Sequence, residues 1–224
     1  MITPLPLWIN LLFIACVVFS ILFFYLSNKN SIQYVIIILI IAFIQSIAAY
    51  SGFYLNTEAF PPRFILVLAP TFVLFFLAFR NNKIETILNY RRTKVSTFLH
   101  LVRIPVEIVL LHLFLNDMIP QLMTFEGRNY DILAGITAII VGALHYKDRI
   151  SKRFMILWNY IGLALIFFIV INGLLSSELP FQQFAFDQPN RAVLYFPFVL
   201  LPAVVVPIVI FTHITDIMKL RRNN

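Results

Sequence analysis

Seven long apolar segments follow one another along the chain, and they constrain its fold more than any other feature. Each is close to the roughly 20 residues that a helix needs to cross a bilayer. The seven predicted helices are residues 5–26, 32–54, 63–79, 95–119, 130–147, 154–176 and 191–216. Only 12% of the 224 residues are charged, against about 25% in a typical soluble domain. We therefore expect one all-α transmembrane domain over residues 1–224, and not a soluble enzyme.

The positively charged residues alternate from loop to loop between these helices. Thirteen of the 17 Lys and Arg residues follow the first, third and fifth helices or lie in the C-terminal tail. Since short cytoplasmic loops collect Lys and Arg, this pattern predicts an N-terminus outside the cell and a C-terminus in the cytoplasm. The net charge of +7 is then explained by basic loops on the cytoplasmic side of a lipid bilayer, and we expect no nucleic-acid partner.

The predicted helix 95–119 carries the most ionisable residues, which are expensive at membrane depth and often functional. His100, Arg103 and Glu107 are spaced by three and four residues and share one helix face. We expect Arg103 and Glu107 to form a direct ion pair near the bilayer centre, beside a kink at Pro105. Such a site fits a binding cavity for a small solute, in which Glu107 couples protons. The alternative is an ion pair that only locks the helix against its neighbours.

Two further polar residues lie toward the outer ends of predicted helices. His112 is in the helix 95–119 and Asn172 is in the helix 154–176. We expect them to line an outward-facing cavity together with Arg103 and Glu107. Alternatively, they form ordinary hydrogen bonds between helices.

Four potential metal ligands fall at a similar depth in the cytoplasmic half. They come from three predicted helices and are His100, His145, His213 and Asp216. This is a ligand set suited to zinc or iron, or to the axial ligation of haem. No HExxH motif fixes their spacing, so the alternative is histidines that hydrogen-bond neighbouring helices. The sequence does not assign an enzymatic activity.

Two loops on the predicted outer side are rich in polar and aromatic residues. They cover residues 120–131 and 176–191, and their candidate contact residues are Glu126, Arg128, Asp187 and Arg191. These loops suggest a second hypothesis, a sensor or accessory subunit that binds a periplasmic ligand or another membrane protein.

A pattern of turn-forming residues occurs twice. Gly52, Glu58, Pro61-Pro62-Arg63 and Pro70 correspond in order to Gly173, Glu178, Pro189-Asn190-Arg191 and Pro197. The two copies predict a parallel repeat with a 3+1+3 arrangement of helices, as known in small facilitators. Chance is the alternative, because Gly and Pro are common at membrane helix ends.

Residues 100–215 resemble a group of uncharacterised bacterial seven-helix membrane proteins. The segments that carry the resemblance are RIPVE (103–107), MTFEGRNYD (123–131), WNY (158–160) and FAFDQPNRAVLYFPF (184–198). The resemblance implies a bacterial inner membrane protein and brings no substrate, reaction or cofactor. The leading hypothesis from the sequence is therefore a small-solute carrier or facilitator.

Overall fold

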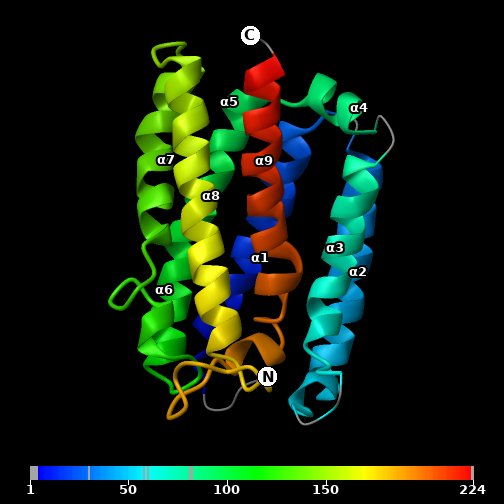
Figure 1. Cartoon of the computed structure of the whole chain (residues 1–224), viewed down its shortest axis with the longest axis vertical. Coiled ribbons are helices and arrows are strands. Elements are labelled where there is room, and N and C mark those ends of the chain that lie inside the picture. The colour runs from blue at the N-terminus through cyan, green and yellow to red at the C-terminus, as the bar shows by residue number, and fades with distance from the viewer. Residues whose placement is uncertain (1–4, 30, 58, 60, 81–82, 223–224) are drawn as a thin grey trace.

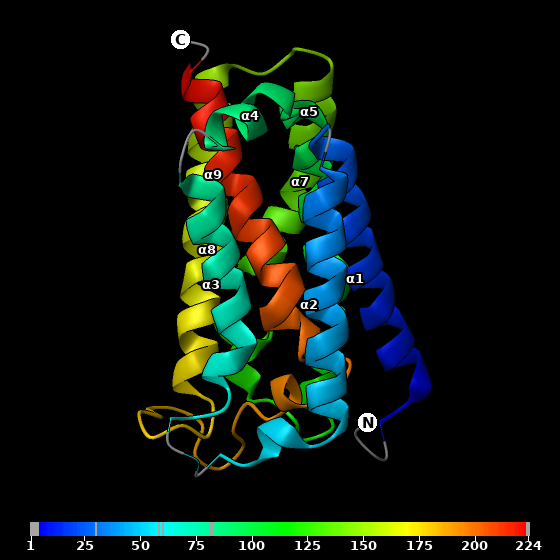
Figure 2. The same cartoon turned by 90° about the vertical axis from the view of Figure 1, so that its right-hand side faces the viewer.

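The regular structure of the chain is helical, as the sequence predicts. The computed structural model describes residues 5–29, 31–57, 59, 61–80 and 83–222. Within these ranges the extended pairing consists of one isolated antiparallel bridge between Asn28 and Arg91. The long helices run side by side along the long axis of the molecule (Figures 1 and 2).

Most of the helices overlap the predicted segments, and α4 lies between two of them. They are α1 (Leu7–Ser27), α2 (Ile32–Tyr50), α3 (Ile65–Phe79), α4 (Lys83–Tyr90), α5 (Thr93–Ser96), α6 (Arg103–Phe114), α7 (Asp131–Tyr146), α8 (Lys152–Leu175) and α9 (Val206–Arg222). Short 3₁₀ segments are η1 (Phe53–Leu55), η2 (Thr97–Val102), η3 (Gln121–Met123) and η4 (Ala192–Leu194), and η5 (Leu201–Val205) is a π-helical turn.

Among the described residues, five helices are long and apolar enough to cross a membrane. They are α1, α2, α8, the continuous helix Thr93–Phe114 formed by α5, η2 and α6, and the helix Leu201–Arg222 formed by η5 and α9. The helices α3 and α4 would together make a sixth span, bent by 86°. The apolar helix α7 has 16 residues, about 24 Å at 1.5 Å per residue, which is less than the roughly 30 Å hydrocarbon core.

Two helices differ in their bounds from the prediction, one at its start and one at its end. The predicted helix 191–216 becomes continuous only from Leu200, because Pro197 and Pro202 lack the N–H that would extend it toward the N-terminus. The predicted helix 95–119 ends at Phe114, and Asp117 in the following loop has a φ of 58°. Instead of a kink at Pro105, the 3₁₀ segment η2 precedes α6, so Pro105 lies in the first turn of α6, where its N–H is not needed.

The last span lies at the centre of the bundle and α2 at its edge. Over the most apolar 18 residues, 61% of Leu201–Arg222 is buried, against 17% of α2. The exposed side chains of α2 are large and apolar, among them Ile36, Phe43 and Ile47. In Figure 1, α2 and α3 both lie on one side of the bundle, and Figure 2 shows them apart in front of the last span. These two helices contact the rest of the bundle mainly at α1 and η5.

Prolines in two helices leave carbonyl groups that neighbouring side chains satisfy. Pro70 cannot donate to the Leu66 carbonyl, which instead accepts a hydrogen bond from Gln45 Nε2 at 3.0 Å. Pro207 likewise leaves the Ala203 carbonyl without its helical donor, and Thr71 Oγ1 donates to it at 3.1 Å. In a bilayer, freed backbone groups need such partners. The first bond joins α2 to α3, and the second joins α3 to the central span.

We expect Thr71→Val to loosen α3 from the central span. The substitution keeps the volume and removes the donor to the Ala203 carbonyl, at a cost of about 1 kcal/mol. The measurement is the unfolding midpoint of the purified protein in mixed micelles. Ser46→Ala is the control, because the Ser46 hydroxyl donates to Ala42 of its own helix. Equal midpoints for both variants would contradict the role given to Thr71.

Candidate functional site

A buried guanidinium connects four helices at the centre of the bundle. Arg103, at the start of α6, is 2% exposed. Its Nη1 donates to Asp131 Oδ1 of α7 at 2.9 Å. Its Nη2 donates to the Gly162 carbonyl of α8 at 3.3 Å and to His213 Nε2 of α9 at 2.8 Å. One side chain therefore fixes the relative positions of α6, α7, α8 and α9.

The bonds around His213 define its protonation. A guanidinium can only donate, so Nε2 of His213 accepts the bond from Arg103. The proton then sits on Nδ1, which donates to Asn159 Oδ1 at 2.8 Å. Asn159 is oriented by its own Nδ2, which donates to the Met155 carbonyl at 2.8 Å. His213 is therefore a neutral imidazole whose two nitrogens are both engaged.

His100 packs on His213 and makes no hydrogen bond to the described part of the protein. The two rings are stacked, with centroids 3.9 Å apart and planes inclined by 16°. Trp158 contacts the His100 ring edge-on at 5.3 Å. Both ring nitrogens of His100 are buried without a hydrogen-bond partner. Stacked rings do not aim their nitrogens at one point, so this pair lacks the geometry of two ligands on one metal ion.

Glu107 lies one turn along α6 from Arg103 and is 1% exposed. Its Oε1 accepts a hydrogen bond from Asn129 Nδ2 at 2.5 Å, and Asn129 Oδ1 accepts one from the Asp131 backbone N–H at 3.1 Å. Its Oε2 is buried without a hydrogen-bond partner. The predicted direct pair with Arg103 is therefore wrong: Asp131, at the start of the adjacent helix, takes the guanidinium, and Asn129 takes the Glu107 carboxyl.

A cavity of about 100 Å³ adjoins Glu107. It lies between α3, α6, α8 and η5, and its walls are mostly apolar. The polar residues that line it are Glu107, Asn129, Asp131 and Asn190. Asn190 Nδ2 donates to the Gly173 carbonyl at 3.2 Å, while its Oδ1 is buried without a partner. An apolar cavity with a few converging polar atoms is the usual form of a small-molecule site.

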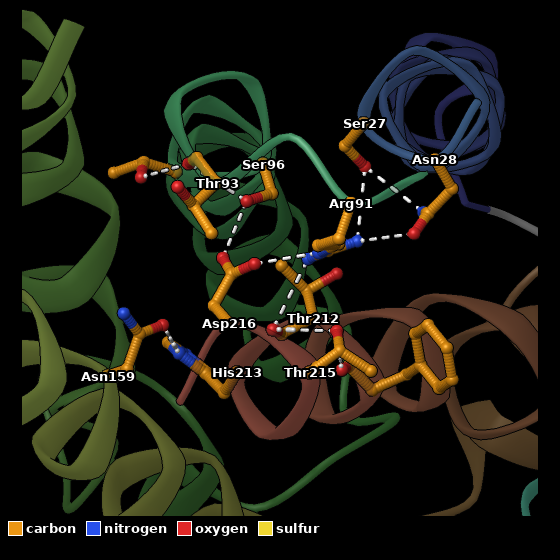
Figure 3. A network of polar contacts seen from close by, with 12 residues as sticks. Ser27, Asn28, Arg91, Thr93, Ser96, Asn159, Thr212, His213, Thr215 and Asp216 are labelled. Carbon is orange, nitrogen blue, oxygen red and sulfur yellow. Dashed lines mark hydrogen bonds and ion pairs between the residues drawn. The ribbon is translucent and has the colours of Figure 1, made fainter. Parts of the chain in front are cut away.

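A second buried ion pair lies toward the end of the bundle that carries α4, α5 and the C-terminus, here called the basic end (Figure 3). Arg91 Nε donates to Asp216 Oδ1 at 2.7 Å, and Ser96 Oγ donates to Asp216 Oδ2 at 2.5 Å. Arg91 also donates to Ser27 Oγ at 3.3 Å and to Asn28 Oδ1 at 3.0 Å. Arg91 is one of the basic residues that follow the third predicted helix, in a predicted loop, but the structure buries it.

Backbone pairing places Arg91 in this position. The Arg92 N–H donates to the Ser27 carbonyl at 2.8 Å, and the Lys29 N–H donates to the Tyr90 carbonyl at 3.2 Å. This short pairing holds the chain after α4 against the end of α1. The Arg91 guanidinium is thereby directed toward α9, where it also donates to the Thr212 carbonyl at 3.3 Å. A hydrophobicity pattern does not predict this backbone pairing or the burial of Arg91.

The four candidate metal ligands separate into different networks. His100 and His213 are stacked, Asp216 is paired with Arg91, and His145 Nε2 lies 3.1 Å from Thr93 Oγ1. Within the described ranges, no group of three His, Cys, Asp or Glu side chains has an arrangement suited to a metal ion. The donor geometry therefore gives no support to the zinc, iron or haem hypothesis.

Two other candidates lie away from the cavity. The His112 ring contacts Trp8 of α1 edge-on at 4.6 Å. Asn172 Nδ2 donates to the Phe168 carbonyl of its own helix at 2.8 Å. Of the five predicted binding residues, Glu107 thus lines the cavity. Arg103 and His100 lie in the network that Asp131 joins to it, and His112 and Asn172 lie outside both.

The predicted outer-loop residues are exposed at the opposite end of the bundle. Arg191 pairs with Glu178, which raises the pKa of Arg191. Arg128 lies 5.8 Å above the Phe184 ring, and Glu126 and Asp187 are exposed. The Arg128–Phe184 contact joins the two loops, and Gln188 Nε2 attaches the second loop to the end of α6 by donating to the Phe114 and Ile119 carbonyls at 3.1 and 2.6 Å. They cover this end of the helix bundle as one layer.

A family described as a domain of unknown function (DUF8737) matches residues 61–221. The chain belongs to this family. No curated protein and no solved structure matches the chain. The DUF8737 region contains both buried arginines and the Glu107 cavity, whereas Ser27 and Asn28 lie before it. Membership in a family without an assigned function agrees with the resemblance to an uncharacterised group.

Sequence reasoning missed Asn129, Asp131 and Asn190 as site residues. Asn129 and Asn190 lie just before predicted helices, and Asp131 is the second residue of the predicted helix 130–147. Polar residues are expected at such positions on general grounds. A signal was nevertheless present, since all three lie in segments that carry the resemblance. Residues 103–107 contact residues 129–131 through the Arg103–Asp131 and Glu107–Asn129 bonds, so two of these segments form one site.

We expect Gly162→Ala to disrupt the central network. A Cβ at this position would lie 2.4 Å from His213 Cε1 and 2.6 Å from Nε2, and the buried ring would have to leave Arg103. Overpacking of this kind costs about 1–3 kcal/mol, measurable as a lower unfolding midpoint. Ala164→Val on the exposed face of α8 is the matched control. A Gly162→Ala protein as stable as wild type would refute the close packing of His213 on α8.

Removing the Arg91 cation should strongly destabilise the basic end. Arg91→Met leaves Asp216 buried without its ion-pair partner, which costs about 3–5 kcal/mol. The control is Lys94→Met. Lys94 pairs with the exposed Asp148, lowers the pKa of that carboxyl, and should contribute little to stability. The free energy of unfolding of both variants is measured by chemical unfolding in micelles. Similar losses of unfolding free energy in the two variants would show that burial does not make the Arg91–Asp216 pair stronger than the Lys94–Asp148 pair.

Proposed function

We propose that this protein is a membrane carrier for a small solute, with Glu107 as its coupling residue. The observation that supports this proposal is the position of the Glu107 carboxyl. It is buried in the continuous helix Thr93–Phe114, in a residue that lines an apolar cavity. One of its oxygens is held by Asn129, and the other has no hydrogen-bond partner. A carboxyl that served only to lock helices would have both oxygens engaged by neighbouring groups.

The charges around the cavity support a coupling role. Arg103 and Asp131 compensate each other, and His213 is neutral because its hydrogen bonds fix one proton on it. Glu107 therefore has no cation of its own. An uncompensated charge is costly at membrane depth. Loading the site with a proton or a solute cation would remove that cost, and this is the condition for coupling two fluxes.

The last span provides a means of movement. The π-helical turn η5 and Pro202 lie beside the cavity, and Leu201, Pro202 and Val206 line it. π-helical turns interrupt the regular ladder of a helix and are frequent at functional sites. A carrier must expose its site alternately to the two sides of the membrane. Repacking of η5 against α3 would open the cavity without breaking the bonds made by Arg103.

Seven crossings of a bacterial inner membrane fit this function best. In addition to the five long helices, α3 and α7 would cross as shorter helices, with the basic end in the cytoplasm. The 3+1+3 repeat remains a hypothesis. Gly52 ends α2 with a φ of 74°, whereas Gly173 lies inside α8 against Met123. Glu58, the next residue of the repeat, lies outside the described residues.

The exposed charges on the outer loops favour one alternative function, that of a sensor or accessory subunit. Glu126, Arg128 and Asp187 are exposed together on the layer that covers this end of the bundle. In a sensor or accessory subunit, this layer would bind a periplasmic ligand or another membrane protein. Such a protein would lose function when these residues change and keep it when Glu107 changes.

Solute exchange in reconstituted vesicles tests the carrier proposal. Vesicles with the purified protein are loaded with a defined mixture of amino acids, amines, organic acids and polyols, and solute loss is followed by mass spectrometry. We expect protein-dependent loss of at least one class of solute. Glu107→Gln should reduce it at least about tenfold, the effect of removing one charged hydrogen bond.

Glu126→Gln is the matched control, because it neutralises an exposed carboxyl on the outer loops. It should leave exchange unchanged. If no solute leaves the vesicles, or if Glu107→Gln exchanges solute as fast as wild type, the carrier proposal is wrong.

A further inference from the structure

The free atoms of the Glu107 cavity determine which chemical group can bind there. The two polar atoms that line it without a hydrogen-bond partner are Glu107 Oε2 and Asn190 Oδ1. Asn190 is oriented by the bond from its Nδ2 to the Gly173 carbonyl, so its oxygen is the free atom. Both residues are at least nine-tenths buried, at 1% and 4% exposure. With Glu107 ionised, both atoms are acceptors, so a ligand between them must donate hydrogen bonds.

The charge that the ligand must carry follows from the groups around Glu107. Arg103 on α6 and Asp131 on α7 form a pair, Asn129 is uncharged, and His213 on α9 is neutral. His100 stacks on His213 beside the Arg103 cation, where a second positive charge would be buried unpaired. The sum over these elements is one negative charge, on Glu107. One monovalent cation, or one proton, neutralises the site.

The remaining walls describe the body of the ligand. They are formed by apolar side chains from α6, α8 and α9, among them Leu110, Ile166, Ile169, Val170 and Val206. Such walls do not replace the hydration shell of a metal ion, and they offer no donors to a second carboxylate. A cavity of about 100 Å³ is smaller than the ~150 Å³ cavity known to hold benzene, so about five non-hydrogen atoms fit.

We infer that this cavity binds a small alkylammonium ion in exchange for a proton. The inference rests on the proposed function and names its substrate class. When the ammonium enters, the protonated Glu107 carboxyl releases its proton to water and forms an ion pair with the ligand, so one positive charge replaces another. No covalent bond forms. Because the site holds either cation but not both, the two fluxes run in opposite directions with a ratio of one to one.

Calorimetry with three compounds of similar shape tests the inference. The probes are isobutylammonium, isobutanol and isobutyrate, titrated into wild-type protein in nanodiscs of uncharged lipid at pH 7, with empty nanodiscs as the blank. Titration in two buffers with different heats of ionisation gives the number of protons released. We expect isobutylammonium to bind at least about tenfold more tightly than isobutanol, with release of about one proton, and isobutyrate not to bind.

Two variants separate the roles of charge and space. Glu107→Gln should weaken isobutylammonium binding at least about tenfold and abolish proton release. Ile169→Phe fills the cavity, keeps the carboxyl and should also abolish binding. The controls are Glu85→Gln, which changes an exposed carboxyl at the basic end, and Ile171→Phe, which changes an exposed side chain of α8, the helix that carries Ile169. Both controls should bind isobutylammonium like wild type.

Several results would overturn the inference. They are equal binding of isobutyrate or isobutanol, no binding of isobutylammonium, or unchanged proton release in Glu107→Gln. The vesicle experiment distinguishes this failure from that of the carrier proposal. If the exchanged solutes contain no amines, the protein is a carrier with a different substrate. If amines bind with proton release and no solute crosses, the cavity has the inferred ligand and the carrier proposal fails.

Discussion

The fold depends on the burial of Arg103. A guanidinium is always charged, and in a low-dielectric interior it must be surrounded by acceptors. The carboxylate of Asp131, the carbonyl of Gly162 and the unprotonated nitrogen of His213 supply them from three other helices. Each partner can accept only if its helix has a given position and rotation. The requirement to solvate one cation thus fixes four helices at once, which apolar packing in a lipid environment would leave less defined.

Arg91 is a second buried cation that connects helices, toward the basic end. It connects the end of α1, the chain before α5, and α9 through Ser27, Asn28 and Asp216. The helix pair α2 and α3 has no comparable ionic connection to the centre among the described residues. It is attached through hydrogen bonds to proline-freed carbonyls, such as that of Thr71 to Ala203. The bundle therefore has one part that two buried arginines hold together and a second part that neutral hydrogen bonds attach, and α3 of the second part lines the cavity.

The sequence predicted the helices better than the contacts between them. Apolar length is a property of a continuous segment, so α1 and α8 follow directly from the pattern. Arg103 and Glu107 were correctly selected as buried, because a charge inside an apolar segment is visible in sequence. Their partners were not selected, since Asn129 and Asp131 lie where a predicted loop meets a predicted helix, and polar residues are expected there whether or not they are buried. Arg91 was assigned to a loop for the same reason, because only the pairing with Ser27 buries it.

The π-helical turn η5 has a consequence for the rotation of the last span. A π turn accommodates one residue more than an α turn, and one residue corresponds to about 100° around the helix axis. His213 and Asp216 lie C-terminal to the turn, and each is held by an arginine. The segment after Val206 therefore has a fixed angular phase. The segment before it, which lines the cavity, can change phase by moving the extra residue along the helix, and the cavity wall can turn while both ion pairs stay intact.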